Sequence, residues 1–128
     1  MHGLHLTADL RGCANGSPLM TDAHALRERC LAVVSAAGLQ TVGDVFHPFA
    51  SRLTLAPSAP TGITGVVLLA ESHMAVHTWP ELSAVTLDVY VCNFGADNSA
   101  KAHAVMDALV GMFAPTAVSR HALERGRA

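Results

Sequence analysis

The chain has 128 residues, 51% of them hydrophobic and 14% charged, and its net charge is −2 with histidine neutral. This length predicts a single domain over residues 1–128. The lack of a basic run argues against a nucleic-acid partner. No apolar run reaches the roughly 18 residues of a membrane span, so no membrane partner is expected. The three cysteines form no CxxC pair, which argues against a disulfide framework or a zinc ribbon and, with no secretion signal visible at the N-terminus, favours the cytoplasm.

The first half of the chain predicts two strands and one helix. Residues 4–10 alternate loosely between apolar and polar side chains, as a strand does, and residues 12–18 predict a loop. Thr21 or Asp22 can cap a helix that ends near Gly38. Its apolar positions recur at helical spacing: Leu26, Cys30, Val33 and Val34. Residues 41–46 predict a short strand that ends before Pro48, and residues 50–60 predict a loop.

The second half predicts the rest of a sheet and a second helix. Residues 63–70 are a continuous apolar run, which predicts a strand buried on both faces or at an interface. Strands over 74–79 and 84–92 are joined by a turn that begins at Pro80, and residues 93–98 predict a loop. Asn98 or Ser99 caps a helix that Pro115 stops, residues 116–119 predict a last strand, and residues 120–128 a frayed tail.

Together these elements predict an α+β fold. We expect a two-layer sandwich in which two helices pack on one face of a mainly antiparallel sheet of about six strands.

The strands over 74–79 and 84–92 predict where Ser72 lies. In a hairpin that turns near Glu81, the numbers of facing residues sum to about 163, so Ser72 faces Val91 and Glu71 faces Cys92. The Cys92 thiol is therefore expected beside the peptide bond between Glu71 and Ser72. A shift of one residue would turn Cys92 to the other face.

The same alternation separates Ser72 from His77. The two residues are five positions apart, so a regular strand sends their side chains to opposite faces. Either a bulge intervenes, or Ser72 uses a histidine from another subunit, which requires a dimer. The high apolar fraction of so small a domain also suggests a buried subunit interface.

A serine, a histidine and a thiol in this arrangement suit a particular chemistry. A serine hydroxyl can attack the carbonyl of the preceding residue and form an ester. Removal of the serine α-proton, for which neutral imidazole is suited, then expels the Glu71 carboxylate and leads to a pyruvoyl group at Ser72. A pyruvoyl ketone can form a Schiff base with a substrate amine and accept electrons from a departing carboxylate, and a thiol can return the proton.

Three segments carry a resemblance to a known family: residues 70–73 (Ala-Glu-Ser-His), 77–81 (His-Thr-Trp-Pro-Glu) and 88–92 (Asp-Val-Tyr-Val-Cys). On these segments the chain resembles the prokaryotic S-adenosylmethionine decarboxylase proenzymes. The resemblance runs from the first strand to Gly126. It implies a self-processing carboxy-lyase that decarboxylates S-adenosylmethionine for the biosynthesis of spermidine and other polyamines.

The resemblance also implies residue roles. Ser72 becomes the pyruvoyl cofactor, and cleavage between Glu71 and Ser72 yields a β chain of residues 1–71 and an α chain of residues 72–128. His77 assists processing, Cys92 donates the proton to the product, and Thr64 stands where the family has a serine that supports processing. Three residues are implied to bind the substrate around adenine and ribose: Phe49, Trp79 and Glu81. The family implies a homodimer of αβ units with the site at the interface.

Departures from the family pattern leave the substrate open. They are the long loop over 50–60, the segment over 93–98, and Asp9 in place of a glutamate. An alternative is a pyruvoyl-dependent decarboxylase of ornithine or arginine, with Asp97 or Glu81 holding the distal cation. A further alternative is a non-catalytic partner that activates a related enzyme.

Two other interpretations fit the sequence less well. A hydrolase that uses Ser72, His77 and Asp88 lacks the GxSxG motif around its nucleophile. His73 and His77 are four residues apart, which on a strand places them roughly 13 Å from each other, too far for one metal ion. We therefore predict no metal site.

Overall fold

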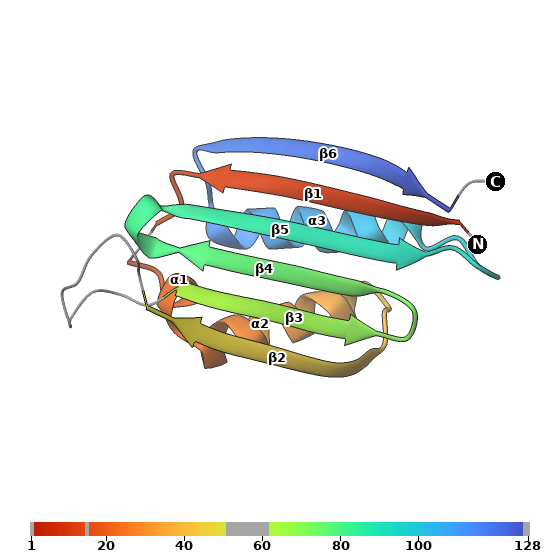
Figure 1. The fold of residues 1–128 in the computed structure, drawn as a ribbon, viewed down its shortest axis with the longest axis horizontal. Helices are drawn as coiled ribbons and strands as arrows, with labels where there is room; N and C mark the ends of the chain where they lie inside the picture. The colour runs from red at the N-terminus through yellow and green to blue at the C-terminus, as the bar shows by residue number, and fades with distance from the viewer. Residues whose placement is uncertain (1, 15, 51–61, 127–128) are drawn as a thin grey trace.

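The computed structural model describes residues 2–14, 16–50 and 62–126. The strands are β1 (Gly3–Arg11), β2 (Thr41–Phe49), β3 (Gly62–Leu69), β4 (His73–Trp79), β5 (Ala84–Cys92) and β6 (Ala117–Arg125). The helices are α1 (Pro18–Thr21), α2 (Ala23–Ala36) and α3 (Ser99–Phe113), and a 3-10 turn, η1 (Pro80–Leu82), joins β4 to β5. All pairs are antiparallel, in the order β2-β3-β4-β5-β1-β6 (Figure 1).

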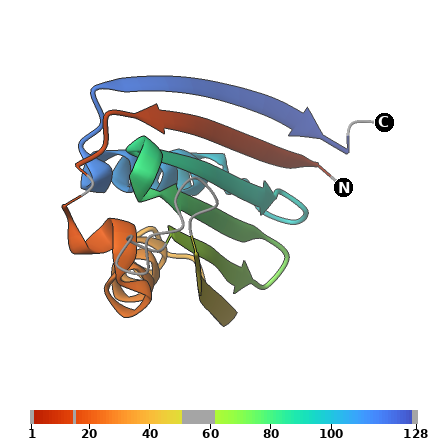
Figure 2. The same ribbon diagram turned by 60° about the vertical axis from the view of Figure 1, so that its left-hand side comes forward.

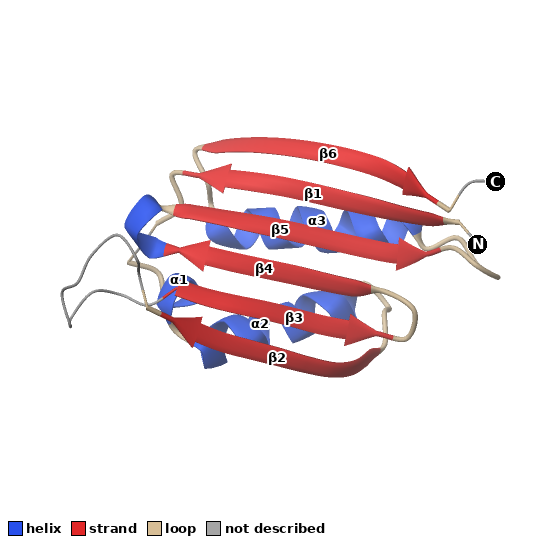
Figure 3. Ribbon diagram, viewed as in Figure 1, coloured by secondary structure: helices blue, strands red, loops and turns tan. Residues whose placement is uncertain are grey.

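The predicted α+β two-layer sandwich is confirmed. Helices α2 and α3 both lie on the same face of the sheet, α2 behind β2 and β3 and α3 behind β5 and β1 (Figure 2, Figure 3). The core fills the space between the two layers, because one side chain in two along each central strand points toward the helices. Its largest fully buried members are Leu10, Met20, Leu26, Ile63, Met74, Leu87, Met106 and Leu109.

The opposite face of the sheet is covered by no helix of the described chain, and we call it the open face. Its side chains alternate with the core residues along each strand. It carries His5, Val45, His47, Phe49, Thr64, Leu68, His73, His77, Trp79, Asp88, Tyr90, Cys92 and Leu123. Three of these apolar side chains are strongly exposed: Val45 at 61%, Leu68 at 48% and Leu123 at 58%.

The predicted helix ends are close to those observed. The carboxylate of Asp22 accepts hydrogen bonds from the backbone N–H groups of His24 and Ala25 and so caps α2. Gly38 follows α2 with a φ of 82°, in the left-handed region that glycine adopts without strain. Helix α1 was not predicted; Ser17 caps it and Pro18 occupies its first turn.

Two strand predictions were wrong. Strand β2 continues through Pro48 to Phe49, because β2 is an edge strand, where a residue without an N–H can be accommodated. The segment predicted as a frayed tail belongs to β6, which pairs with β1 as far as Arg125.

Only one face of β3 is buried in the single chain, since Thr64 and Leu68 are exposed. The predicted loop over 50–60 lies, apart from Ala50, outside the described residues.

Candidate active site

The predicted register of the β4–β5 hairpin is confirmed. Trp79 faces Ala84 and His73 faces Tyr90, so the numbers of facing residues sum to 163 along the whole ladder. The ladder runs without interruption from residue 79 to residue 73. No bulge therefore rotates the strand between these positions, and Ser72 lies immediately before its first residue.

Ser72 lies at the end of the sheet where β3 turns into β4. Its hydroxyl oxygen accepts a hydrogen bond of 3.0 Å from the backbone N–H of Cys92. Its own carbonyl accepts a hydrogen bond of 2.9 Å from the backbone N–H of Leu69, which closes the turn. The predicted register therefore brings the backbone of Cys92 into direct contact with Ser72, whereas the placement of the Cys92 thiol beside the peptide bond before Ser72 stays a prediction.

A cavity of about 370 Å³ opens at this turn, and we call it the serine pocket. It is lined by Leu39, Gln40, Leu69, Ala70, Glu71, Ser72, Cys92, Phe94 and Asn98. Cys92 is a free cysteine, is only half-buried, and is one of the residues that line the pocket. Its carbonyl accepts a hydrogen bond of 2.9 Å from the side-chain amide of Asn98.

A second cavity, of about 620 Å³, lies at the other end of the sheet, and we call it the aromatic pocket. It is lined by Phe49, Ala50, Thr64, His77, Trp79, Glu81 and Leu82. The His77 ring stacks on the Trp79 ring with 5.8 Å between centroids, and Phe49 meets Trp79 edge-on at 6.5 Å. The hydroxyl of Thr64 lies 3.2 Å from Nδ1 of His77.

A glycine shapes the floor of the aromatic pocket. A side chain at Gly62 would collide with the ring of Phe49 and with the backbone carbonyl of Thr78. The absence of a side chain at this position therefore lets the Phe49 ring lie close over β3, beside Trp79.

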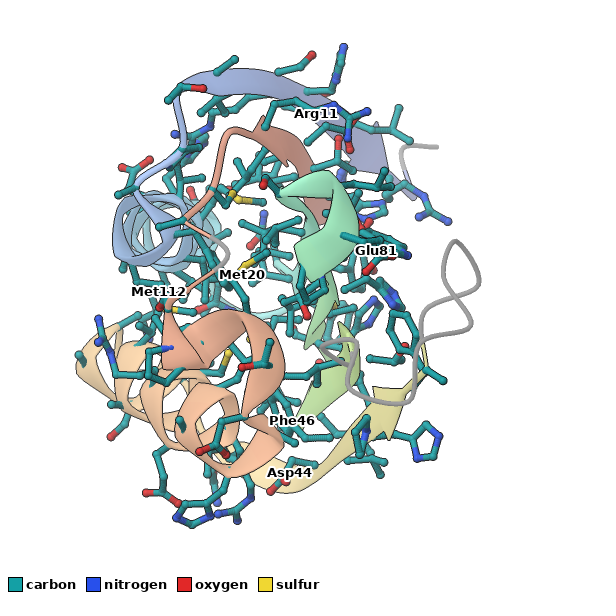
Figure 4. All side chains as sticks on the ribbon, turned by 90° about the vertical axis from the view of Figure 1, so that its left-hand side faces the viewer. Arg11, Met20, Asp44, Phe46, Glu81 and Met112 are labelled. Atoms are coloured by element: carbon teal, nitrogen blue, oxygen red, sulfur yellow. The ribbon has the colours of Figure 1, made fainter. Side chains whose placement is uncertain are left out.

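Glu81 brings a carboxylate to the same pocket. It lies on η1 at the end of the sheet (Figure 4). One of its oxygens, Oε2, is buried and has no hydrogen-bond partner among the described residues. Because an unsatisfied buried acceptor is costly, this oxygen suits a ligand that carries hydroxyl or amine donors.

The two pockets lie at opposite ends of β4. Ser72 and His77 are five residues apart, which along a strand is roughly 17 Å. The structure therefore brings Ser72 together with Glu71 and Cys92, and His77 together with Thr64, Phe49, Trp79 and Glu81. Within one chain it does not bring the two groups together.

Comparison with known proteins identifies the family. The family model described as S-adenosylmethionine decarboxylase matches residues 4–126. The chain belongs to the S-adenosylmethionine decarboxylase family. The resemblance predicted from the three sequence segments is thereby confirmed.

Relatives named S-adenosylmethionine decarboxylase proenzyme match nearly the whole chain. The protein from Hydrogenobaculum sp. is 35% identical, over 97% of this chain and 81% of its own. The protein from Archaeoglobus fulgidus is 32% identical, over 97% of each. The crystal structure of the adenosylmethionine decarboxylase from Aquifex aeolicus superposes with a TM-score of 0.81 at 33% identity, covering 98% of this chain and 92% of that one.

The structure shows several contacts near the site that the sequence did not predict. Asn98 was predicted only as a possible helix cap, yet its side chain contacts Cys92. His5 and Asp88, whose side chains meet diagonally between β1 and β5 with 2.9 Å between Nε2 and Oδ1, were not predicted as a pair. Asp97 lines neither pocket; its carboxylate accepts from the backbone N–H of Ser99, and this hydrogen bond holds the pKa of Asp97 below its usual range.

The described residues offer neither a cluster of metal ligands nor a helix that could span a membrane. No three histidine, cysteine, aspartate or glutamate side chains among residues 2–14, 16–50 and 62–126 come together as metal ligands would. No helix in that part of the chain combines the length and the apolar character that crossing a membrane requires.

Proposed function

We propose that this member of the S-adenosylmethionine decarboxylase family cuts its own chain between Glu71 and Ser72. The products are a β chain of residues 1–71 and an α chain of residues 72–128. The processed enzyme then decarboxylates S-adenosylmethionine and supplies the product to spermidine biosynthesis. The observation that carries this proposal is the Ser72 hydroxyl, held by the backbone N–H of Cys92 in a pocket that Glu71 also lines.

The attack that begins self-cleavage uses groups that the turn before β4 already holds. The Ser72 hydroxyl oxygen attacks the Glu71 carbonyl carbon, the peptide C–N bond breaks, and the freed amine keeps the hydroxyl proton. A base then removes the α-proton of Ser72, and the Cβ–Oγ bond breaks, so that Glu71 leaves as a carboxylate carrying the former serine oxygen. Water replaces the nitrogen, which departs as ammonia. We assign His77 and Thr64 to this processing, because their hydrogen bond orients the imidazole.

The residues around Ser72 fit the pyruvoyl group that this reaction makes. Ser72 lines an open pocket together with the half-buried residue Cys92, so a substrate amine can reach this position. A pyruvoyl ketone supplies an electrophile for the amine of the substrate and a sink for the electrons of its departing carboxylate. We assign to the Cys92 thiol the return of a proton to the product.

The aromatic pocket supports the choice of substrate. Phe49 and Trp79 offer ring faces and edges suited to a purine, and Glu81 has a buried oxygen that lacks a donor among the described residues. Ribose hydroxyls are donors of the required kind. By contrast, Asp97 already accepts a hydrogen bond from Ser99 and lies outside both pockets, so nothing about its position favours ornithine or arginine.

We further propose that the active enzyme is a homodimer whose two sites lie between the subunits. In one chain the serine pocket and the aromatic pocket are at opposite ends of the sheet. When two open faces pack about a two-fold axis that lies between the two sheets, parallel to them and perpendicular to the strands, the Ser72 end of each sheet meets the His77 end of its partner. The exposed Val45, Leu68 and Leu123 on this face would be buried by such packing.

The free cysteines of the chain bear on the cellular compartment in which the enzyme works. Cys13, Cys30 and Cys92 are free thiols, and free thiols are typical of a reducing compartment. We propose the cytoplasm, where the substrate and the polyamine pathway that we assign to the enzyme would meet it.

One experiment tests the substrate. Carbon dioxide release is measured from carboxyl-labelled S-adenosylmethionine, ornithine and arginine, with the Ser72→Ala variant as control. We expect release from S-adenosylmethionine alone and none from the variant. Release from ornithine or arginine alone would establish the alternative substrate, and no release from any substrate by a stable, uncleaved chain would favour a non-catalytic partner.

A second experiment tests the shared site. The Ser72→Ala and His77→Ala variants are each produced alone and then together, with tags that distinguish them by mass. If His77 acts on Ser72 of the partner, neither variant is cleaved alone, and the His77→Ala chain is cleaved in the mixture. Cleavage that occurs equally in the mixture and in the separate preparations would contradict an intersubunit site.

A further inference from the structure

The peptide groups on both sides of Cys92 are held by hydrogen bonds. The N–H of Cys92 donates to the Ser72 hydroxyl oxygen at 3.0 Å. Its carbonyl accepts from the Asn98 side-chain amide at 2.9 Å. Asn98 also lines the serine pocket. The backbone that presents an N–H to Ser72 is therefore fixed from the other side by a residue of the loop before α3.

Asn98 occupies the N-cap position of α3 without capping it. An asparagine at this position ordinarily accepts hydrogen bonds from the first N–H groups of the helix, yet the Asn98 side chain makes no such bond. Asp97, one residue earlier, accepts from the Ser99 N–H at 2.9 Å instead. The Asn98 side chain instead directs its amide toward the carbonyl of Cys92.

The position of Asn98 is itself fixed by the start of the loop. Its backbone N–H donates to the side-chain oxygen of Asn93 at 2.7 Å. The amide of Asn93 in turn donates to the Ser99 hydroxyl at 3.1 Å. Asn98 is thus held from its backbone while its side chain holds Cys92, which is an arrangement suited to fixing the Cys92 peptide in place.

The oxygen that receives the Cys92 N–H is the atom on which charge develops during processing. In the elimination step the Cβ–Oγ bond of Ser72 breaks, and the electron pair of that bond leaves on Oγ as part of the Glu71 carboxylate. A backbone N–H placed on an oxygen that gains negative charge stabilises the transition state. The Cys92 N–H is 3.0 Å from that oxygen before the reaction begins.

We propose that Asn98 is a positioning residue for this elimination step. By holding the carbonyl of Cys92, it keeps the neighbouring N–H on the departing oxygen of Ser72. The inference rests on the self-processing proposed above, and it gives the segment over 93–98, which departs from the family pattern, a defined role.

The test compares Asn98→Ala and Asn98→Asp with wild type. Aspartate has the shape of asparagine but offers no donor to the Cys92 carbonyl. Each purified chain is sampled over time with and without hydroxylamine, which splits an ester between Glu71 and Ser72 and leaves a Glu71 hydroxamate identifiable by mass. Loss of one neutral hydrogen bond is expected to slow conversion of the ester about three- to tenfold, so the hydroxamate fraction rises in both variants.

Asp97→Ala is the matched control. It removes the hydrogen bond from the Ser99 N–H in the same loop and leaves the contact with Cys92 in place, so the ester should convert at the wild-type rate. An unchanged hydroxamate fraction in the Asn98 variants, an equal rise in Asp97→Ala, or loss of the fold in both Asn98 variants would overturn the proposal. If wild type itself never cleaves, the proposed function fails, and this outcome is distinct from failure of the Asn98 inference alone.

Discussion

Among the described residues, Thr78 is the only polar residue that is buried in the core. It lies between His77 and Trp79, two residues of the aromatic pocket. Its hydroxyl donates to the carbonyl of Met20 at 2.8 Å and accepts from the backbone N–H of Ile63 at 2.9 Å. Met20 lies in α1 and points between the helices and the sheet (Figure 4). The hydroxyl therefore links α1 and β3 to β4, directly beside His77 and Trp79.

The Thr78→Val substitution keeps the shape of the side chain and removes both hydrogen bonds. Each buried backbone group left without a partner costs about 1–3 kcal/mol, so the two groups together should lower the free energy of unfolding by roughly 2–6 kcal/mol. Thr78→Ser is the control, because it keeps the hydroxyl and loses one buried methyl, at a cost of roughly 1 kcal/mol.

Urea unfolding at equilibrium measures this difference. The chain has one tryptophan, Trp79, whose fluorescence reports the region around Thr78. The variants are made on a Ser72→Ala background so that every sample is an unbroken chain. A valine variant as stable as the serine variant would show that the two hydrogen bonds do not hold β4 in place, and would refute the reasoning.

Three further predictions concern the pockets and the core. Glu81→Gln should raise KM for S-adenosylmethionine about tenfold or more, as expected for a charged hydrogen bond, and leave self-cleavage unchanged; equal KM values would remove Glu81 from the substrate site. Thr64→Val should slow self-cleavage, followed by gel electrophoresis, whereas Thr64→Ser should not, because only the valine lacks the hydroxyl near His77; equal rates in both would contradict its role. Burial raises the pKa of the Cys30 thiol from 9.0 to about 12, so the unfolded chain releases this proton first as pH rises. Between pH 9.0 and about pH 12, the free energy of unfolding should then fall by up to about 1.4 kcal/mol per pH unit. If the same slope persists in Cys30→Ala, another group causes it.

The part of the fold that carries the site could be predicted because its signals are local. Alternating side chains along β4 and β5 and a turn beginning at Pro80 leave one register in which both strands bury their apolar residues. That register alone places Cys92 beside Ser72. Alternation along the strand predicted that Ser72 and His77 lie on opposite faces, but the two pockets at opposite ends of β4 were found only in the structure.

Other features depend on tertiary context that one sequence does not display. Strand β6 exposes every one of its residues, so it has no apolar alternation, and only its pairing with β1 defines it. Pro48 is accommodated in β2 because of the strand's place at the sheet edge. Asn98 stands at the N-cap position of α3, yet its side chain contacts Cys92 and does not cap the helix, an outcome that capping preferences do not predict.

The intact mass of the purified protein is the most direct test of self-processing. Processing predicts two fragments, residues 1–71 and residues 72–128, the second lighter by the mass of ammonia than the same fragment beginning with serine. The Ser72→Ala variant should give one unbroken chain of the same fold. A wild-type chain that stays unbroken under every condition, or a break that leaves serine at the new terminus, would contradict the proposed origin of the cofactor.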